Sequence, residues 1–456
     1  MSTLLLFGVF AQLATQAPAV ADLPTSYVVV VSHQTLDDPA WKPVVDALIA
    51  KHQGQVLEYD KLSDAKTELS KRLPKFACFV ATPGEANKSF VAQVHQLTRQ
   101  LDDDPYTDVV WGILTGFDAA NALRIAKTTE PLLIHKVASG TDLPLELFDE
   151  GVCYSELEAG RILSKKPGQA PGIEKGPVDT TSRLADCLGD GHADLFVTSG
   201  HATERDWQIG FRYRNGTFQS KGGKLFGVDT KGVQHPIGAD QPRAYLAVGN
   251  CLMGHIDGPD AMALAFLNSA GVRQMVGYTD LTWFGYGGWG VLDYFVEQPG
   301  RFTLAQAFHA NHLALLHKLE TEFPNEARKL SGAGARNGLL YDRDIVAFYG
   351  DPAWEVRVKP APCGWDQALT EQDGTYTLTI TPKLGTKSFQ LLNPNGSQRG
   401  GRPAIEFLPH RVKHVTIVDG KDLSPVVSDN FVLLPLPREP ELNRQYRVVF
   451  TAQRVE

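Results

Sequence analysis

Between residues 27 and 134, short apolar runs alternate with stretches of helical spacing, and this rhythm strongly constrains the fold. Residues 27–31 form a β-branched run, and the helical stretch 41–52 that follows stops at Gly54. Further strands are predicted at 56–59, 76–81 and 109–114, and further helices at 64–73, 89–101 and 118–126. Strands and helices that alternate in this way predict a parallel, doubly wound α/β sheet.

The rhythm resumes after residues 162–179, which contain Lys165-Lys166-Pro167-Gly168 and are expected to form a linker or an exposed loop. Further strands are predicted at 193–198, 244–248 and 274–278, and further helices at 179–188, 261–270 (capped by Asp260) and 303–319. A polar hairpin insertion with an Asn215-Gly216 turn separates the first two of these strands.

Two of the predicted strands stop abruptly at loops of small residues, and each loop carries one reactive side chain. Ser199-Gly200-His201 follows the strand at 193–198, and Gly249-Asn250-Cys251 follows the strand at 244–248. In open α/β sheets, ligands bind beyond the carboxyl ends of the strands. If the two strands are parallel neighbours, His201 and Cys251 reach the same rim of the sheet.

This pair predicts a catalytic site. A thiol becomes a useful nucleophile when a base or a positive charge lies beside it, and an imidazole can supply either. Cys251 is therefore the candidate nucleophile and His201 the candidate general acid or base, with the backbone N–H groups of Cys251 and Ala202 as donors to an oxyanion. The alternative is that Cys251 is an inert buried cysteine and His201 a satisfied polar residue at a strand end.

The segment 280–289, which follows the next strand, interleaves aromatic residues with glycines. Trp283, Tyr286 and Trp289 are candidates for the wall of a substrate groove, although loop aromatics packed onto the core explain the pattern equally well. Asp280 and Asp293 flank the segment, and either is a candidate for the base of a pocket that binds a basic side chain.

A zinc site is a rival interpretation of the same loops. His201, Cys251, His255 and Asp257 supply ligand types that zinc accepts, and a catalytic zinc needs three protein ligands and an open position.

Length, charge and hydropathy limit the number of domains and the classes of function that the chain can have. The 456 residues suffice for about three domains. The net charge of -8, without a cluster of Lys and Arg, argues against a nucleic-acid-binding role. No later segment has 18 consecutive apolar residues, so no transmembrane span is expected.

The N-terminus and the cysteines indicate whether the protein is secreted. Residues 4–10 are apolar and Ala19-Val20-Ala21 follows, which is typical of a secretory signal, although no basic residue precedes the apolar run. An irregular N-terminal tail is the alternative. The five cysteines leave at least one thiol unpaired, and a Cys153–Cys187 disulfide is one option in a secreted protein.

From about residue 370 the pattern changes to short alternating runs, at 375–380, 412–418 and 446–450. Turn residues separate these runs, among them Asn393-Pro394-Asn395-Gly396. Short strands without a helical pattern predict a β-sandwich of about 90 residues.

Three motifs together resemble the gingipain family, secreted bacterial cysteine peptidases of the caspase-like clan: Ser-Gly-His-Ala at 199–202, Gly-Asn-Cys at 249–251 and Phe-Tyr-Gly-Asp-Pro-Ala at 348–353. The resemblance covers residues 27–358, and the β-rich tail resembles the immunoglobulin-like module that follows the gingipain catalytic domain. It implies a Cys–His dyad of Cys251 and His201. The family has Gly after the catalytic His, where this chain has Ala202, and the Gln-Ala-Cys-x-Gly signature of true caspases is absent. No specificity residue matches, so a preference for Arg or Lys is only an analogy.

The sequence therefore predicts an α/β protein with doubly wound, caspase-like or flavodoxin-like sheets in two subdomains and a C-terminal immunoglobulin-like β-sandwich. The expected boundaries are 1–21 for the signal, 22–160 and 178–360 for the subdomains, and 366–456 for the sandwich. The predicted function is that of a secreted or envelope-associated cysteine endopeptidase of protein or peptide substrates. No cofactor is required, and nothing in the sequence supports calcium.

Two other functions stay open at this point. The chain is alternatively a degenerate peptidase fold whose β-sandwich serves binding or adhesion, or a zinc hydrolase.

Overall fold

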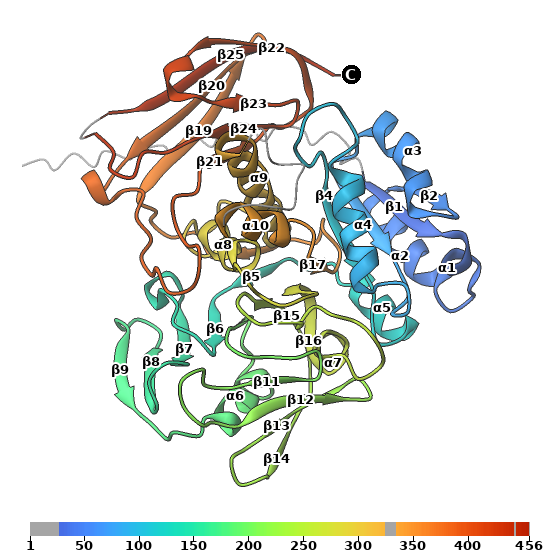
Figure 1. The fold of residues 1–456 in the computed structure, drawn as a ribbon, viewed down its shortest axis with the longest axis vertical. Helices are drawn as coiled ribbons and strands as arrows, with labels where there is room; N and C mark the ends of the chain where they lie inside the picture. The colour runs from blue at the N-terminus through green and yellow to red at the C-terminus, as the bar shows by residue number, and fades with distance from the viewer. Residues whose placement is uncertain (1–26, 324–333, 442–443, 456) are drawn as a thin grey trace, which may run out of the picture.

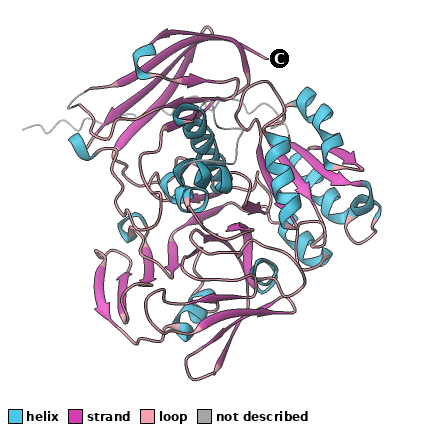
Figure 2. Ribbon diagram, viewed as in Figure 1, coloured by secondary structure: helices cyan, strands magenta, loops and turns pink. Residues whose placement is uncertain are grey.

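The computed structural model describes residues 27–323, 334–441 and 444–455, so the signal expected at 1–21 lies outside the described residues. A twelve-stranded sheet runs through the α/β part of the molecule in the order β2-β1-β3-β4-β17-β16-β15-β10-β6-β7-β8-β9 (Figure 1). Helices flank its strands, whereas the C-terminal region is almost entirely strand and loop (Figure 2).

The first half of the sheet follows the predicted rhythm. Its strands are β1 (Tyr27–Ser32), β2 (Gln55–Tyr59), β3 (Phe76–Val80) and β4 (Val110–Leu114), and every pairing among them is parallel. The helices are α1 (His33–Asp37), α2 (Lys42–His52), α3 (Ala65–Arg72), α4 (Lys88–Thr98) and α5 (Ala119–Ala126). The strands are continuous apolar runs because helices cover them, as is usual for buried parallel strands.

The second half contains β6 (Lys136–Ser139), β7 (Glu150–Tyr154), β10 (Leu195–Thr198), β15 (Ala239–Ala247) and β16 (Ala270–Tyr278), all mutually parallel in their pairings. Its helices are α6 (Thr181–Leu188), α7 (Met262–Ser269), α8 (Tyr286–Phe295), α9 (Leu304–Glu322) and α10 (Gly334–Asp342). Strands β6 and β7 extend this half beyond β10, although the sequence groups them with the first subdomain.

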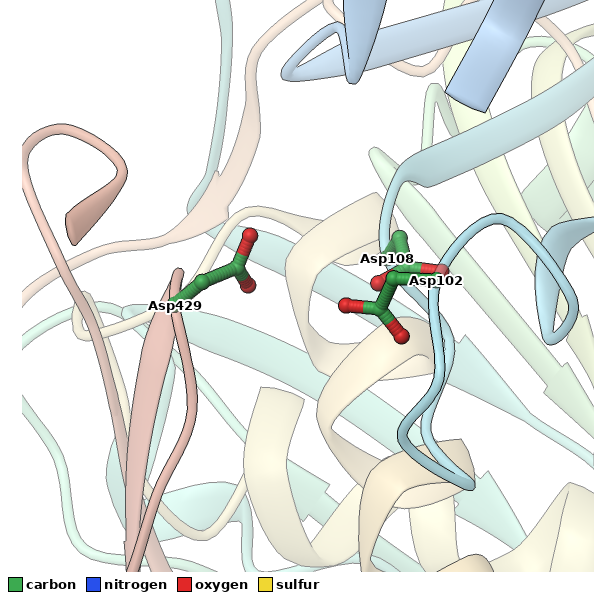
Figure 3. Close-up of side chains that lie close together, drawn as sticks. All are labelled: Asp102, Asp108 and Asp429. Carbon is green, nitrogen blue, oxygen red and sulfur yellow. The ribbon is translucent and has the colours of Figure 1, made fainter. Parts of the chain in front are cut away.

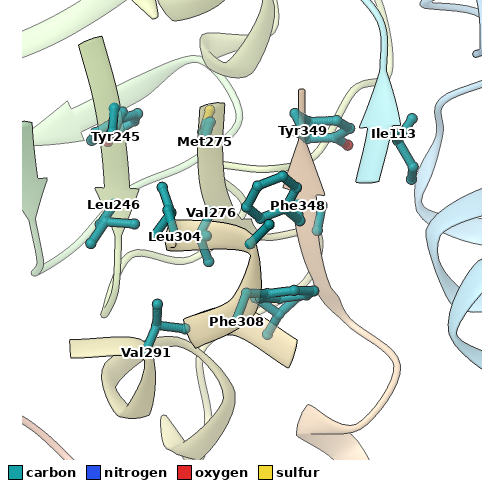
Figure 4. Packing of buried hydrophobic residues seen from close by; sticks show 14 of the residues in the cluster. Ile113, Tyr245, Leu246, Met275, Val276, Val291, Leu304, Phe308, Phe348 and Tyr349 are labelled. Atoms are coloured by element: carbon teal, nitrogen blue, oxygen red, sulfur yellow. The ribbon is translucent and has the colours of Figure 1, made fainter. Parts of the chain in front are cut away.

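Strand β17 (Val346–Tyr349) joins the two halves. It is parallel to β4 and antiparallel to β16, so the strands of the second half run opposite to those of the first. The carboxyl ends of the two sets therefore face opposite edges of one sheet. Side chains of β15, β16 and β17 pack against α8 and α9 at this junction (Figure 4). One buried apolar cluster includes residues of both halves, and burial of each Val, Leu, Ile, Phe or Met side chain in it contributes about 1.5–3 kcal/mol.

Several smaller elements complete the α/β part. The stretch 162–179, expected as a linker, instead contributes to the antiparallel edge strands β8 (Arg161–Lys165) and β9 (Gly172–Lys175), because β7 offers an open edge on which they pair. The insertion between β10 and β15 forms the antiparallel sheet β11 (Asp206–Gln208), β12 (Thr217–Lys221), β13 (Lys224–Val228) and β14 (Gln234–Ile237). Strands β5 (Leu132–Ile134) and β18 (Val356–Val358) pair with each other.

The C-terminal region consists of two antiparallel sheets. One contains β19 (Trp365–Gln372), β20 (Thr375–Pro382), β25 (Tyr446–Arg454) and β22 (Val412–Asp419), and the other contains β21 (Ala404–Phe407), β24 (Phe431–Leu434) and β23 (Val426–Val427). Side chains of both sheets share one buried apolar cluster. We call this region the C-terminal module.

Two local expectations are wrong. Asp260 does not cap α7: its carboxylate accepts the N–H of Gly222 at 2.6 Å, and Ala261 occupies the cap position without a side-chain bond. All five cysteines are free thiols, so the Cys153–Cys187 disulfide is not formed. None of the helices in the described residues is long and apolar enough to cross a membrane.

Candidate active site

The two strands that carry the His and Cys loops are parallel neighbours. Thr198 at the end of β10 lies opposite Ala247 at the end of β15, and the N–H of Val248 donates to the carbonyl of Thr198 at 3.0 Å. The two strands therefore bring the His201 loop and the Cys251 loop to the same edge of the sheet.

Asn250 ties the two loops together. Its side-chain amide donates to the carbonyl of Gly200 at 3.0 Å, and its oxygen accepts the hydroxyl of Thr198 at 2.6 Å. Asn250 is fully buried, so both bonds are shielded from competing water. This side chain fixes the spacing between the His201 loop and the Cys251 loop.

Cys251 differs from the other cysteines near the sheet. It lies in a turn and is partly exposed, and the N–H of Thr282 donates to its Sγ at 3.2 Å. Cys78 and Cys153, in contrast, are completely buried, and burial raises the pKa of both thiols well above the ordinary value. Among these three sulfurs, the environment suits that of Cys251 to attack a substrate.

His201 presents an exposed imidazole on the neighbouring loop. The ring packs against the ring of Phe211, with 4.7 Å between their centroids, and the backbone carbonyl accepts the N–H of Gln208 at 2.9 Å. The contacts fix the backbone and one face of the ring. An exposed imidazole that is oriented in this way can exchange protons with a substrate and with water.

The two backbone donors expected for an oxyanion are unused. Ala202 forms an isolated bridge with Trp207, but within the described ranges neither its N–H nor that of Cys251 donates to an acceptor. Unpaired N–H groups at neighbouring strand ends have the chemistry that an oxyanion site needs.

The predicted aromatic groove wall is only partly correct. Trp283 is 57% exposed, and Leu281 beside it is 55% exposed. Tyr286 and Trp289, however, lie in α8, all ten residues of which are buried. Both side chains therefore belong to the core, and the exposed apolar rim beside Cys251 consists of Leu281 and Trp283.

Trp289 packs against the loop that carries Cys251. A Cβ on Gly249 would lie 2.7 Å from the indole Nε1 of Trp289, and a Cβ on Gly396 would lie 2.3 Å from its Cε3. Only glycine permits this approach at either position. The indole is thus held between the Cys251 loop and a loop of the C-terminal module.

Neither candidate acid is free to bind a basic side chain. Asp280 pairs with the ammonium of Lys88 at 2.7 Å. Burial acts to raise the pKa of Asp280, but the bonds from Lys88 and from the N–H of Leu281 outweigh it and lower the pKa. Asp293 is buried and pairs with Arg399 and Arg402.

Two further strand ends contribute residues that the sequence patterns did not reveal. Thr141 follows β6, and Glu156 follows β7. Glu156 is 8% exposed; one carboxylate oxygen accepts the hydroxyl of Thr141 at 2.9 Å, and the other accepts that of Ser199. Burial raises the pKa of Glu156 to about 7 despite these bonds. The signal that could have found it is a lone acid directly after an apolar strand.

A loop of the C-terminal module reaches the same cluster. The side-chain amide of Asn395 donates to the hydroxyl oxygen of Thr141 at 2.6 Å. The loop is fastened to α8, because Arg399 pairs with Asp293 and the guanidinium of Arg402 lies 3.5 Å from the ring centroid of Tyr286. Asn395, Thr141, Glu156 and Ser199 thus form one chain of hydrogen bonds that ends two residues before His201.

The four proposed zinc ligands do not converge. The Nδ1 of His255 lies 3.1 Å from the carbonyl oxygen of Thr279, and Asp257 pairs with Arg205 at 2.7 Å. These two groups are therefore engaged with partners other than Cys251 and His201.

The group of potential metal ligands that the described residues do bring together is elsewhere, at Asp102, Asp108 and Asp429 (Figure 3). Burial and the neighbouring carboxylates raise the pKa of Asp108 to about 9, and the guanidinium of Arg411 pairs with Asp429.

Comparison with solved structures finds the Arg-specific cysteine proteinase gingipain R. The match has a TM-score of 0.47 and 11% sequence identity, and it covers 95% of this chain and 99% of that chain. No protein-family model and no curated protein matches this chain. At this identity we transfer no residue role and no specificity from that protein.

Proposed function

We propose that this protein is a cysteine endopeptidase in which Cys251 is the nucleophile and His201 transfers the proton. The observation that carries the proposal is the parallel pairing of β10 with β15, with Asn250 bonded to the His201 loop at 3.0 Å. This pairing brings an exposed imidazole and a partly exposed sulfur to adjacent loops at one edge.

The proposed reaction has two steps. The Cys251 thiolate attacks the carbonyl carbon of the scissile peptide, the C–N bond breaks, and His201 gives its proton to the departing amine. Water then attacks the thioester, His201 accepts the proton of that water, and the carboxylic acid leaves as the thiolate re-forms. The N–H groups of Cys251 and Ala202 hold the carbonyl oxygen while it carries negative charge.

The remaining contacts suit this mechanism. The N–H of Thr282 donates to Sγ at 3.2 Å and so helps to hold the sulfur in position. The rim formed by Leu281 and Trp283 offers apolar surface to substrate side chains beside the sulfur. The protein is further proposed to have a caspase-like catalytic region followed by an immunoglobulin-like sandwich, and to be secreted after removal of residues 1–21. Sequencing the N-terminus of the mature protein from its host tests the last point.

The decisive experiment compares Cys251→Ala with the matched variant Cys363→Ala. Cys363 is also a partly exposed free thiol, but it lies beside the C-terminal module. Hydrolysis of a mixed peptide library should fall to background in Cys251→Ala and stay unchanged in Cys363→Ala. Circular dichroism checks that both variants fold. Full hydrolysis by folded Cys251→Ala would refute the mechanism.

A further inference from the structure

We propose that the hollow beside His201 binds an acidic side chain of the substrate through the guanidinium groups of Arg212 and Arg214. The hollow has a volume of about 560 Å³ and is lined by seven residues: Gln208, Phe211, Arg212, Tyr213, Arg214, Asn215 and Thr217. This inference deepens the proposed peptidase function and rests on it for the place of the hollow in a substrate groove.

The hollow adjoins the proposed catalytic imidazole. Phe211 lines it, and the ring of Phe211 packs at a tilt against that of His201, with 4.7 Å between centroids. Gln208 also lines it, and the backbone N–H of Gln208 donates to the carbonyl of His201 at 2.9 Å. A peptide that lies across the His201 loop therefore has a side chain within reach of this hollow.

The charged residues that line the hollow are both positive. None of its seven residues is acidic, and in the part of the chain that the structure describes no carboxylate pairs with the guanidinium of Arg212 or Arg214. Arg205 of the same insertion, in contrast, pairs with both oxygens of Asp257 at 2.7 and 2.9 Å. In a chain with a net charge of -8, two arginines that line one hollow, and that pair with no carboxylate of the described residues, are available for a carboxylate from outside.

The loop that presents the arginines is held in place by its backbone. The N–H groups of Phe211 and Arg212 donate to the carbonyl of Glu156 at 2.6 and 3.1 Å, and the hydroxyl of Tyr213 donates to the carbonyl of Ser155 at 2.7 Å. The loop is closed at its base by a bond from the N–H of Ile209 to the carbonyl of Gly216 at 3.0 Å. These bonds do not involve the guanidinium groups, so substitution of the two arginines should leave the loop intact.

The test measures binding first, because binding does not require turnover. Inactive Cys251→Ala protein is titrated with fluorescent peptides that differ only by Glu or Gln at one position, with the position varied along the peptide. At one position the Glu peptide should bind about 10-fold more tightly, as expected for a charge-assisted pair. Adding Arg212→Gln and Arg214→Gln should remove most of that preference, whereas Lys224→Gln, at an exposed lysine of the same insertion, should retain it.

The active protein provides the second measurement. The ratio of kcat/KM for the same peptide pairs should favour Glu in the wild type and shrink in the double arginine variant. Higher ionic strength should also reduce the ratio, because exposed charges are screened. Equal binding of Glu and Gln peptides at every position, or a preference that survives both arginine substitutions, overturns this inference. If the Glu preference depends on the arginines but no peptide is hydrolysed, the acidic subsite stands and the peptidase proposal fails.

Discussion

At the edge where β1 and β3 end, Glu85 accepts the hydroxyls of Ser32 and Thr35 at 2.6 and 2.5 Å. At the opposite edge, where β6 and β10 end, Glu156 accepts the hydroxyls of Thr141 and Ser199. Each half of the sheet thus uses a glutamate to fasten two hydroxyl groups at its carboxyl edge.

The two glutamates nevertheless have opposite electrostatic outcomes. Burial acts to raise the pKa of Glu85, but bonds from Ser32, Thr35 and the N–H of Thr82 outweigh it and lower the pKa. Glu156 is more deeply buried and lacks a backbone donor to its carboxylate, so burial dominates and raises its pKa to about 7. One additional N–H and better access to water decide the charge of an otherwise similar carboxylate.

The hollows at the two edges also differ in chemistry. The first edge has a hollow of about 630 Å³, lined by hydroxyls and charged groups that include Ser32, His33 and Glu85, but by no cysteine. The second edge carries Cys251 and His201 on adjacent loops. Both edges follow the rule that ligands bind beyond the carboxyl ends of strands, so the location of a hollow alone does not identify a catalytic site.

The largest difference that we expect between the two edges separates their histidines. His201→Ala should lower kcat/KM by about 10²–10⁴-fold, because the departing amine loses its proton donor. His33→Ala should leave it unchanged, since the His33 ring is bound to Asp60 at 2.9 Å within the first hollow. Steady-state assays with one library peptide measure both variants. Comparable losses of kcat/KM in the two variants would contradict the assignment of the reaction to the edge that carries His201.

The next prediction concerns stability and pH. Between the ordinary pKa of 4.5 and about 7, folded Glu156 keeps a proton that the unfolded chain releases. The free energy of unfolding should therefore fall as the pH rises through this window, by at most about 3.5 kcal/mol at 1.4 kcal/mol per pH unit. Glu156→Gln cannot release the proton, so urea unfolding of this variant should lose that part of the pH dependence.

Glu85→Gln should give the opposite sign. The pKa of Glu85 is lowered by folding, so its carboxylate stabilises the protein above the pKa of the unfolded chain, and this contribution is lost as the pH falls through the folded pKa. The variant should be less stable than the wild type at pH 7, and the difference should shrink in acid. Parallel pH profiles for the two glutamine variants would contradict the contrast between the edges.

The sequence could predict those features of the fold and the candidate site that depend on residues close together along the chain. The strand ends before His201 and Cys251 are visible because each loop directly follows an apolar run, whereas the parallel pairing of β10 with β15 is only a condition of the prediction and is given by the structure. The contacts of Glu156 could not be predicted, since Ser199 lies 43 residues away along the chain and Asn395 belongs to another module. Bonds of this kind depend on how the modules pack, which no local pattern records.

Tyr286 and Trp289 illustrate the same limit. Their segment contains Gly285, Gly287, Gly288 and Gly290, which favour a loop by propensity, yet α8 begins at Tyr286. Tertiary packing overrides the propensity, because small residues let the helix approach its neighbours: a Cβ on Gly288 would lie 2.4 Å from the Tyr278 ring. The glycines that suggest a loop are thus the residues that allow this helix to be buried.

The smallest effect that we expect concerns the loop of the C-terminal module that carries Asn395. This loop contacts Thr141 at the second edge. Asn395→Ala removes the donor to Thr141, and one neutral hydrogen bond is worth about 0.5–1.5 kcal/mol. Because Thr141 then has greater freedom to turn away from Glu156, kcat should fall several-fold while KM changes little, and the pH profile of kcat should shift. Ser397→Ala, an exposed position of the same loop, is the control. A change confined to thermal stability, with kcat and its pH profile intact, would mean that Asn395 only docks the module and does not position the cluster that supports His201.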